Sequence, residues 1–247
     1  ARILIEELIR QGVDTVFGYP GGAVLNIYDE LYQCRDRIHH VLTAHEQGAA
    51  HAADGFARAS GKVGVVIATS GPGATNLVTG IANAYLDSVP LVAITGNVAT
   101  EALGRDSVQE VDIVSITQPV VKHNFMVKDV SELEQTIKEA FLIANSGRKG
   151  PVLIDIPKDV QVNECEYGVA VLPRMPEKAE LPYDEEVAVK LLNEAKKPFI
   201  YAGGGIVSAG GEDYLRELAE KLNAPVAVSM MGRTAFPDSH PLSLGLV

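Results

Sequence analysis

Tryptophan is absent from this sequence of 247 residues, and cysteine occurs only twice. Cys34 and Cys165 lie far apart without a metal-ligand spacing, so we expect a protein of the reducing cytoplasm. No apolar run approaches the roughly 20 residues of a membrane-spanning helix, which argues against a membrane protein. Basic runs are also absent, and 21 basic against 32 acidic residues leave a net charge of −11. This balance disfavours nucleic acid as the main partner.

The composition is otherwise that of a globular protein with a sizeable core, because 47% of the residues are hydrophobic. Neither a signal peptide nor a transit peptide is recognisable. The sequence starts at Ala1 rather than at Met and stops at Val247, so we expect it to be a piece of a longer protein.

Helical and extended patterns alternate along the first part of the chain. Apolar runs typical of strands buried on both faces of a parallel sheet lie at 63–68, 91–95 and 152–156. Shorter strands are expected at 13–17 and 38–42. Helices are expected before Gly12, at 23–32, 46–59 and 74–85, and from a cap at Ser131 to about 145. This alternation predicts an α/β fold with a doubly wound, mostly parallel sheet.

Residues 161–183 interrupt this pattern with prolines and scattered charges, which are typical of an interdomain linker. Residues 1–160 would form the first domain, and 184–247 would begin a second α/β domain. In this second part, helices are expected at 184–195 and 212–222, with strands at 199–202 and 225–228. Because two strands cannot make a buried sheet, we expect the second domain to be incomplete.

Four polar turns follow predicted strands, at the sheet edge where open α/β folds bind ligands. They span residues 18–22, 43–46, 70–76 and 96–110. His45-Glu46 does not continue as a zinc-binding helix, because Ala49 stands where the second histidine is needed. Gly71-Pro72-Gly73 resembles a phosphate-binding turn, but the acid that a dinucleotide site needs about 20 residues further on is missing. A tight packing turn and a ligand-binding turn both remain open here.

Glu46 is the most informative single carboxylate of the sequence. It follows a strand and starts a helix rich in alanine and glycine, whose small side chains indicate close packing around a buried carboxyl group. By itself this position fits a helix-capping acid as well as an acid–base group. The motifs around it decide between the two.

A series of motifs occurs in a fixed order along essentially the whole chain. They are Gly18-Tyr19-Pro20-Gly21-Gly22-Ala23, His45-Glu46-Gln47-Gly48-Ala49, Gly55-Phe56-Ala57-Arg58, Thr69-Ser70-Gly71-Pro72-Gly73-Ala74-Thr75-Asn76, Gln109-Glu110, Ser146-Gly147-Arg148, Asp155-Ile156-Pro157-Lys158-Asp159 and Gly203-Gly204-Gly205. In this order they resemble the pyrimidine-binding domain of thiamine diphosphate enzymes. Within that superfamily they are similar to the catalytic subunit of acetohydroxyacid (acetolactate) synthase.

The resemblance implies that residues 1–160 bind the pyrimidine half of thiamine diphosphate and that 184–247 begin the middle domain. Glu46 would share a proton with the aminopyrimidine ring, and Gln109 would contact the cofactor or its intermediates; these two are the expected catalytic residues. The cofactor pocket would be shaped by Tyr19, Gly21, Gly22, Pro72 and Asn76. The substrate channel would be lined by Lys158 and Val108.

The resemblance also implies bound FAD, which takes no redox part in the main reaction of this family branch. Its contacts would be Arg148, Gly203, Gly204, Gly205, Ser229, Met230 and Gly232. The glycine run by itself is equally compatible with a turn.

The Mg²⁺ motif of the superfamily begins Gly-Asp-Gly and ends Asn-Asn, and neither occurs in this sequence. We therefore expect no metal ligands here, weak binding of thiamine diphosphate, and no activity from these 247 residues alone.

Two segments depart from the family pattern. Val108 stands where phenylalanine is usual, and Gly96-Asn97-Val98-Ala99 replaces the usual Gly-Gln-Val-Pro. Both lie on loops that the resemblance places near the substrate channel, so they bear on channel shape and substrate preference.

The implied reaction is acetolactate synthesis in branched-chain amino-acid biosynthesis. Pyruvate is decarboxylated, and its two-carbon unit joins a second pyruvate or 2-oxobutanoate. The implied assembly is a homodimer or homotetramer, with a small regulatory subunit among the candidate partners. The alternatives are another thiamine diphosphate enzyme such as pyruvate oxidase or a 2-keto acid decarboxylase, a dinucleotide-binding oxidoreductase domain, and a non-catalytic chain that shares the fold.

Overall fold

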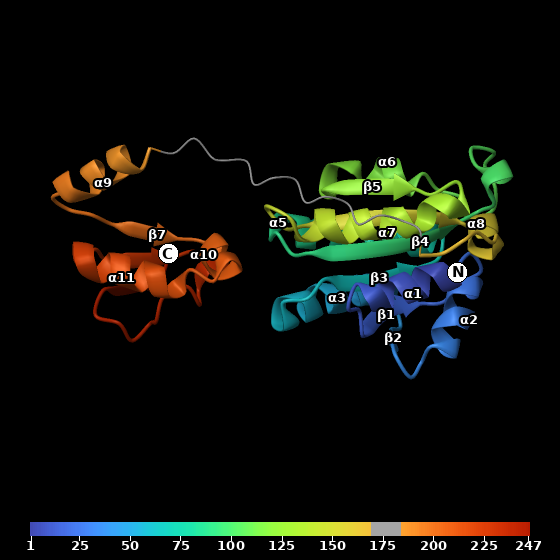
Figure 1. Cartoon of the computed structure of the whole chain (residues 1–247), viewed down its shortest axis with the longest axis horizontal. Helices are drawn as coiled ribbons and strands as arrows, with labels where there is room; N and C mark the ends of the chain where they lie inside the picture. The colour runs from blue at the N-terminus through green and yellow to red at the C-terminus, as the bar shows by residue number, and fades with distance from the viewer. Residues whose placement is uncertain (169–183) are drawn as a thin grey trace. The chain divides into compact units, whose positions relative to one another are not determined.

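The computed structural model describes residues 1–168 and 184–247 of the chain. They belong to two compact units, Ala1–Pro176 and Glu177–Val247. Figure 1 shows the secondary-structure elements of both units.

The first unit is built on a six-stranded parallel sheet with the strand order β2-β1-β3-β4-β6-β5. Its strands are β1 (Thr15–Tyr19), β2 (His39–Leu42), β3 (Gly64–Ala68), β4 (Leu91–Asn97), β5 (His123–Met126) and β6 (Pro151–Pro157). Every residue of β3, β4 and β6 is buried, as their apolar runs predict. The predicted doubly wound α/β fold is therefore confirmed.

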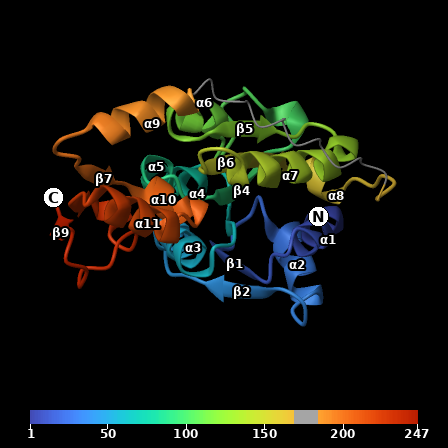
Figure 2. The same ribbon diagram turned by 60° about the vertical axis from the view of Figure 1, so that its left-hand side comes forward.

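Helices cover both faces of this sheet. One face carries α1 (Arg2–Arg10), α2 (Leu25–Gln33) and α7 (Val130–Asn145). The other carries α3 (Glu46–Ser60), α4 (Pro72–Asn76), α5 (Val78–Leu86) and α6 (Ile113–Thr117). Two views show α1 and α2 side by side (Figures 1 and 2).

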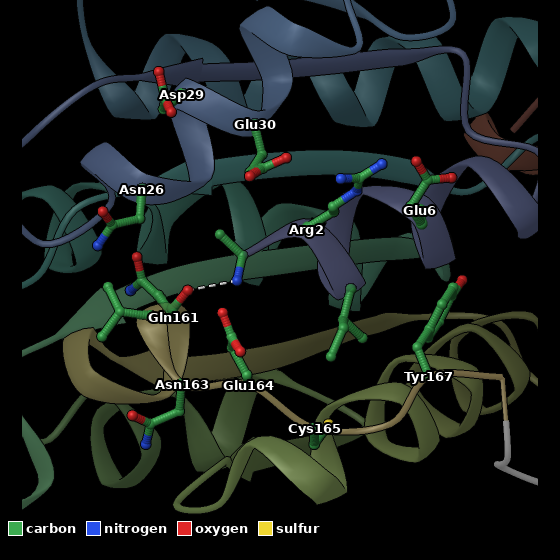
Figure 3. A pocket seen from close by; sticks show the side chains of 13 residues that line it. Arg2, Glu6, Asn26, Asp29, Glu30, Gln161, Asn163, Glu164, Cys165 and Tyr167 are labelled. Carbon is green, nitrogen blue, oxygen red and sulfur yellow. Dashed lines mark hydrogen bonds between the residues drawn. The ribbon is translucent and has the colours of Figure 1, made fainter.

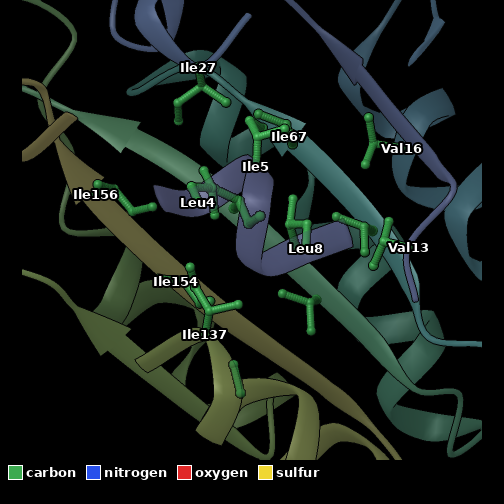
Figure 4. Packing of buried hydrophobic residues seen from close by; sticks show 14 of the residues in the cluster. Leu4, Ile5, Leu8, Val13, Val16, Ile27, Ile67, Ile137, Ile154 and Ile156 are labelled. Atoms are coloured by element: carbon green, nitrogen blue, oxygen red, sulfur yellow. The ribbon is translucent and has the colours of Figure 1, made fainter. Parts of the chain in front are cut away.

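Alternate residues of each strand contribute to two separate hydrophobic cores, because successive side chains of a strand point to opposite faces of the sheet. Val65 and Ile67 of β3 pack in the core under α1, whereas Val66 and Ala68 pack in the core under α3. Figure 4 shows Leu4, Ile5 and Leu8 of α1 among the strand residues Ile67 and Ile154. The layered arrangement places the carboxyl ends of all six strands at one edge of the sheet.

Several local predictions need correction. Ser131 is not the cap of α7: the cap is Asp129, whose side chain accepts a hydrogen bond from the Ser131 backbone N–H. The helix expected at 74–85 is two helices, α4 and α5, which meet at Leu77. Strand β5 and helix α6 were not predicted, because β5 is a half-exposed edge strand of mixed polarity without an apolar run.

The second unit contains the parallel three-stranded sheet β7-β8-β9. Its strands are β7 (Ile200–Ala202), β8 (Val226–Val228) and β9 (Ser243–Leu246), and its helices are α9 (Glu185–Glu194), α10 (Gly204–Ala209) and α11 (Glu212–Leu222). The expectation of two strands was wrong, since β9 is a third. It escaped prediction because Leu244 and Leu246 are exposed and Gly245 interrupts the pattern.

The beginning of the predicted linker packs on the first unit. Helix α8 (Lys158–Val162) follows β6 directly. Further on, the Cys165 thiol donates a hydrogen bond to the Val130 carbonyl (3.5 Å), and the Arg10 guanidinium lies 4.3 Å from the centre of the Tyr167 ring. The rest of the predicted linker, 169–183, lies outside the described residues. Within the described part of the chain, no helix has the length and apolar character needed to cross a membrane.

Candidate functional site

Apart from Arg148, the predicted site residues of the first unit lie at the carboxyl edge of the sheet. Gly21 follows β1, Glu46 follows β2, Pro72 follows β3, Gln109 belongs to the loop after β4, and Lys158 follows β6. Because all six strands are parallel, these turns share one edge. The two ends of the group, Glu46 and Lys158, still lie several strands apart.

Glu46 is a buried carboxylate at the first position of α3, with 9% of its surface exposed. It does not cap the helix: the cap is His45, whose Nδ1 accepts the Gln47 backbone N–H at 3.1 Å. The Glu46 Oε2 atom instead accepts a hydrogen bond of 3.0 Å from the Asn76 amide. The Glu46 carboxyl group therefore does not cap α3 but is held by Asn76, a residue of another helix.

Tyr28 of α2 lies within electrostatic range of this carboxylate. Burial raises the pKa of the Tyr28 phenol, and the negative charge of Glu46 raises it further. The neutral hydroxyl donates to the Ile67 carbonyl of β3 at 3.3 Å. The sequence analysis missed Tyr28, because its place depends on how α2 packs against the sheet.

Thr69 joins the two glycine turns next to Glu46. Its Oγ1 accepts the Ala23 backbone N–H at 3.1 Å. A Cβ atom at Gly21 would lie 2.5 Å from the Thr69 Cβ, and one at Gly73 would lie 2.7 Å from its Cγ2 and 3.3 Å from Glu46 Oε1. Both glycines are therefore required by close packing, and Thr69 is a residue of the site that the sequence analysis did not single out.

We expect Gly21→Ala to lower the unfolding free energy of the chain by about 2 kcal/mol, because Thr69 cannot move without losing its bond to Ala23. Gly22→Ala is the matched control, since no atom lies within 4 Å of a Cβ built there. Urea unfolding of both variants checks this expectation. Equal stability of the two variants would contradict the close packing described for Gly21.

Gln109 is held by its backbone rather than by its side chain. It has a φ of +60°, and a Cβ on the neighbouring Gly71 (φ +58°) would lie 2.9 Å from the Gln109 Cα. The Gln109 side chain and that of Val108, which is 89% exposed, are open to solvent. Tyr19 is also exposed, at 42%. The edge of the sheet thus presents these side chains to a ligand or to another protein surface.

Asp155 is a second buried carboxylate near this edge, with none of its surface exposed. It accepts hydrogen bonds of 2.6 Å from the Thr95 hydroxyl and from the Asn97 amide. Burial raises its pKa to about 7, opposed by these two hydrogen bonds and helped by the charge of Asp112. An isolated Asp inside an apolar strand run was the signal that could have revealed it.

Two predicted residues lie apart from Glu46. Lys158 is exposed at the start of α8. Arg148 precedes β6 and therefore lies at the opposite, amino-terminal edge of the sheet. Its Nε donates to the Ser88 hydroxyl at 2.7 Å and its Nη2 to the Leu86 carbonyl at 3.3 Å.

The predicted residues of the second unit converge at the carboxyl ends of β7 and β8. Gly203 precedes α10, and a Cβ there would lie 3.8 Å from the Ser229 Oγ. A Cβ at Gly232 would lie 3.0 Å from the Gly203 Cα, and one at Gly204 would lie 3.0 Å from the Met231 Cβ. Ser229 Oγ accepts the Gly232 N–H at 3.2 Å, which forms the short turn that exposes Met230. The expected turn at 203–205 is thus the start of a helix.

A pocket of about 620 Å³ lies elsewhere in the first unit (Figure 3). It is lined by α1, α2 and the segment after α8, with the carboxylates of Glu6, Asp29, Glu30 and Glu164 around it. None of the predicted site residues lines it. Across residues 1–168 and 184–247, no three His, Cys, Asp or Glu side chains form a group that could hold a metal ion.

Two family models match the chain. Residues 1–116 match the thiamine pyrophosphate enzyme N-terminal TPP-binding domain, and residues 186–247 match the thiamine pyrophosphate enzyme central domain. The chain thus carries N-terminal and central domains of the thiamine pyrophosphate enzyme family. This confirms the resemblance found in the sequence.

The curated relatives narrow the similarity further. The chain is 52% identical to the acetolactate synthase of Arthrospira platensis, over 99% of this chain and 44% of that protein. It is 49% identical to the acetolactate synthase isozyme 3 large subunit of Escherichia coli, over 100% of this chain and 44% of that protein. A probable acetolactate synthase large subunit of Methanocaldococcus jannaschii is 48% identical, over 100% of this chain and 43% of that protein. The chain thus spans less than half the length of the relatives it matches.

Proposed function

We propose that this chain provides the pyrimidine-binding half of the active site in an acetolactate synthase. The observation that carries the proposal is the buried Glu46 carboxyl group, held by Asn76 beside the Gly21–Thr69–Gly73 packing at the carboxyl edge of the sheet. About half of all positions are identical to the acetolactate synthases named above, which supports this reaction over a 2-keto acid decarboxylase or a pyruvate oxidase. The two family matches disfavour the dinucleotide-binding alternative.

The residues present fit the aminopyrimidine end of thiamine diphosphate. Glu46 has one oxygen occupied by Asn76, which leaves Oε1 beside Gly73 for a ring nitrogen. Tyr19 is the last residue of β1, Gly22 follows it, and Pro72 is the first residue of α4, which also carries Asn76. The Mg²⁺ ion and the diphosphate remain part of the proposal, with their ligands outside these 247 residues.

When bound, thiamine diphosphate supplies the electron sink for decarboxylation and for carbon–carbon bond formation. Glu46 holds the proton that it shares with the pyrimidine nitrogen at Oε1, and a buried site favours such sharing because water does not compete for the carboxyl group. Asn76 donates to Oε2 and fixes the rotamer of the carboxyl group. Gln109 orients the bound ligand, while Val108 and Lys158 line the route by which pyruvate and 2-oxobutanoate enter.

FAD is a separate part of the proposal. It is supported by the glycine and serine turns at the carboxyl ends of β7 and β8, where Gly205 and Met230 are exposed, Gly203, Gly204 and Ser229 are partly exposed, and Gly232 is buried. Arg148 would contribute a charged contact to FAD.

We expect Arg148→Ala to weaken FAD retention by the full-length protein about tenfold. The absorption of co-purified flavin measures this, with Lys149→Ala as control; equal retention in both variants would remove Arg148 from the FAD site.

The oligomeric state and the cellular compartment are further parts of the proposal. We propose at least a homodimer, which can extend to a homotetramer, and a small regulatory subunit. Relatives named large subunits support this last partner. Both cysteines are free thiols, in keeping with a reducing cytoplasm.

Acetolactate formation tests the proposed function. We expect the full-length protein to convert pyruvate to acetolactate when thiamine diphosphate and Mg²⁺ are supplied. We expect the 247-residue chain to form none under the same conditions. Release of acetaldehyde alone by the full-length protein would indicate a decarboxylase instead, and turnover by the 247-residue chain would contradict the placement of the Mg²⁺ ligands outside it.

A further inference from the structure

The loop of residues 98–110, which carries Val108 and Gln109, is fixed by two acidic side chains of a neighbouring segment. We propose that Asp155 of β6 and Asp159 of α8 are positioning residues, which anchor this loop and thereby set Gln109 at the carboxyl edge of the sheet. The role of the loop in the reaction rests on the proposed function. The anchoring itself rests only on contacts within the first unit.

The first anchor is a chain of hydrogen bonds from β6 to the first residue of the loop. Thr95 of β4 is in register with Asp155. The two Asp155 carboxylate oxygens accept separate bonds of 2.6 Å from the Thr95 hydroxyl and the Asn97 Nδ2. The Asn97 Oδ1 then accepts the Val98 backbone N–H at 2.8 Å. All three side chains of this network are at least 98% buried.

This first anchor requires a hydrogen-bond acceptor at position 155 that faces the Asn97 amide. A carboxylate only accepts hydrogen bonds, so it obliges Asn97 to present its NH₂ group and leaves the Asn97 oxygen for Val98. An amide at position 155 would offer one acceptor and one donor. With its oxygen towards the Asn97 NH₂ and its own NH₂ donating to the Thr95 hydroxyl oxygen, such an amide would keep the Asn97 and Val98 bonds, whereas alanine would remove the acceptor altogether.

The second anchor lies four residues further along the same segment. Asp159 Oδ1 accepts the Thr100 backbone N–H at 3.0 Å, and its Oδ2 accepts the Thr100 hydroxyl. Thr100 starts the short 3-10 helix η1 (Thr100–Ala102). Because α8 begins directly after β6, one rigid segment holds both Val98 and Thr100.

The far end of the loop is closed by its own contacts. The Glu110 carboxylate accepts the backbone N–H groups of Gly104 and Ser107, the latter at 3.0 Å. Gln109 adopts a left-handed φ of +60° against Gly71. A non-glycine residue keeps such a conformation only where its surroundings impose it, so Gln109 is held between Gly71 and the Glu110 contacts at this end of the loop, and the two anchors fix the other end.

Amide hydrogen exchange of the 247-residue chain at pH 8 tests the first anchor. We expect Asp155→Ala, which removes the acceptor for the Asn97 amide, to speed exchange of peptide 98–104 at least tenfold while peptide 91–95 changes less than twofold. Thr95→Val is the matched control, because it removes the other partner of the same buried carboxylate but keeps the Asn97 and Val98 bonds. Equal acceleration of both peptides, or the same loop effect in Thr95→Val, would overturn a positioning role for Asp155.

Asp159→Ala provides an independent test at a partly exposed position, because alanine removes both acceptors of Thr100, whereas asparagine could still accept its N–H and donate to its hydroxyl oxygen. It should speed exchange at 100–102 about tenfold and leave 91–95 unchanged; no change at 100–102 would overturn the second anchor. In the full-length protein, the same variant should lower kcat for acetolactate about tenfold with the KM for pyruvate within twofold. An unchanged kcat would overturn the catalytic consequence, whereas a wild-type protein that makes no acetolactate would overturn the proposed function and leave the anchoring intact.

Discussion

Glu46→Gln should reduce acetolactate turnover by the full-length protein by about two to four orders of magnitude. The amide keeps the shape of the side chain and can still meet the Asn76 amide through its oxygen. It cannot share an acidic proton with the pyrimidine nitrogen, so the loss should appear in kcat. Steady-state kinetics with pyruvate, at saturating thiamine diphosphate, measures this effect.

Glu132→Gln is the matched control for this substitution. Both residues are acids in the first turn of a helix, Glu132 in α7 and Glu46 in α3. They differ in burial, because Glu132 is exposed and Glu46 is buried. We expect Glu132→Gln to keep full activity. Turnover of the Glu46→Gln variant within tenfold of the wild type would contradict the acid–base role of Glu46.

Asp155 should make the chain less stable as the pH rises towards neutrality. Its pKa is about 7 in the folded chain against a model-peptide value of 3.8, so the folded chain keeps a proton that the unfolded chain has released between these values. The contribution of Asp155 to the unfolding free energy therefore decreases between about pH 4 and about pH 7, and it stays constant above about pH 7. A shift of this size corresponds to a change on the order of 4 kcal/mol.

Asp155→Asn should remove this pH dependence. From pH 4.5 to pH 7.5, the unfolding free energy of the wild type should fall relative to that of the Asp155→Asn variant. Urea unfolding at both pH values measures this change. Asp159→Asn is the control, because Asp159 is half-exposed and should leave the slope in this range unchanged. Parallel pH profiles for wild type and Asp155→Asn would show that burial does not raise the pKa of Asp155.

The sequence predicts the turns of the site better than the side chains that support them. Glu46, Gly21 and Asn76 each belong to a segment that follows a strand, and the alternation of strands and helices is enough to place such segments at one edge. Thr69 and Tyr28 could not be found this way. Their contacts join residues 46 positions apart (Ala23 and Thr69) and 39 positions apart (Tyr28 and Ile67), next to the pairing of β1 with β3.

The elements that escaped prediction share a physical cause. Strands β5 and β9 are sheet edges with exposed or interrupted apolar positions, so they lack the continuous hydrophobic run of β3 or β6. Asp155 stands out as an acid inside such a run, but its partner Thr95 follows only from the register of β4 with β6, which no local pattern reveals. Arg148 belongs to a recognisable motif, yet only the sheet topology shows that it lies at the edge opposite Glu46.

The most direct test of a thiamine site built around Glu46 is exchange of the thiazolium C2 proton for deuterium on the full-length protein. Rapid mixing with D₂O followed by acid quench and NMR of the released cofactor gives this rate. We expect the wild type and Glu132→Gln to exchange equally fast, and Glu46→Gln to exchange about two to four orders of magnitude more slowly. Exchange at the wild-type rate in Glu46→Gln would contradict the account.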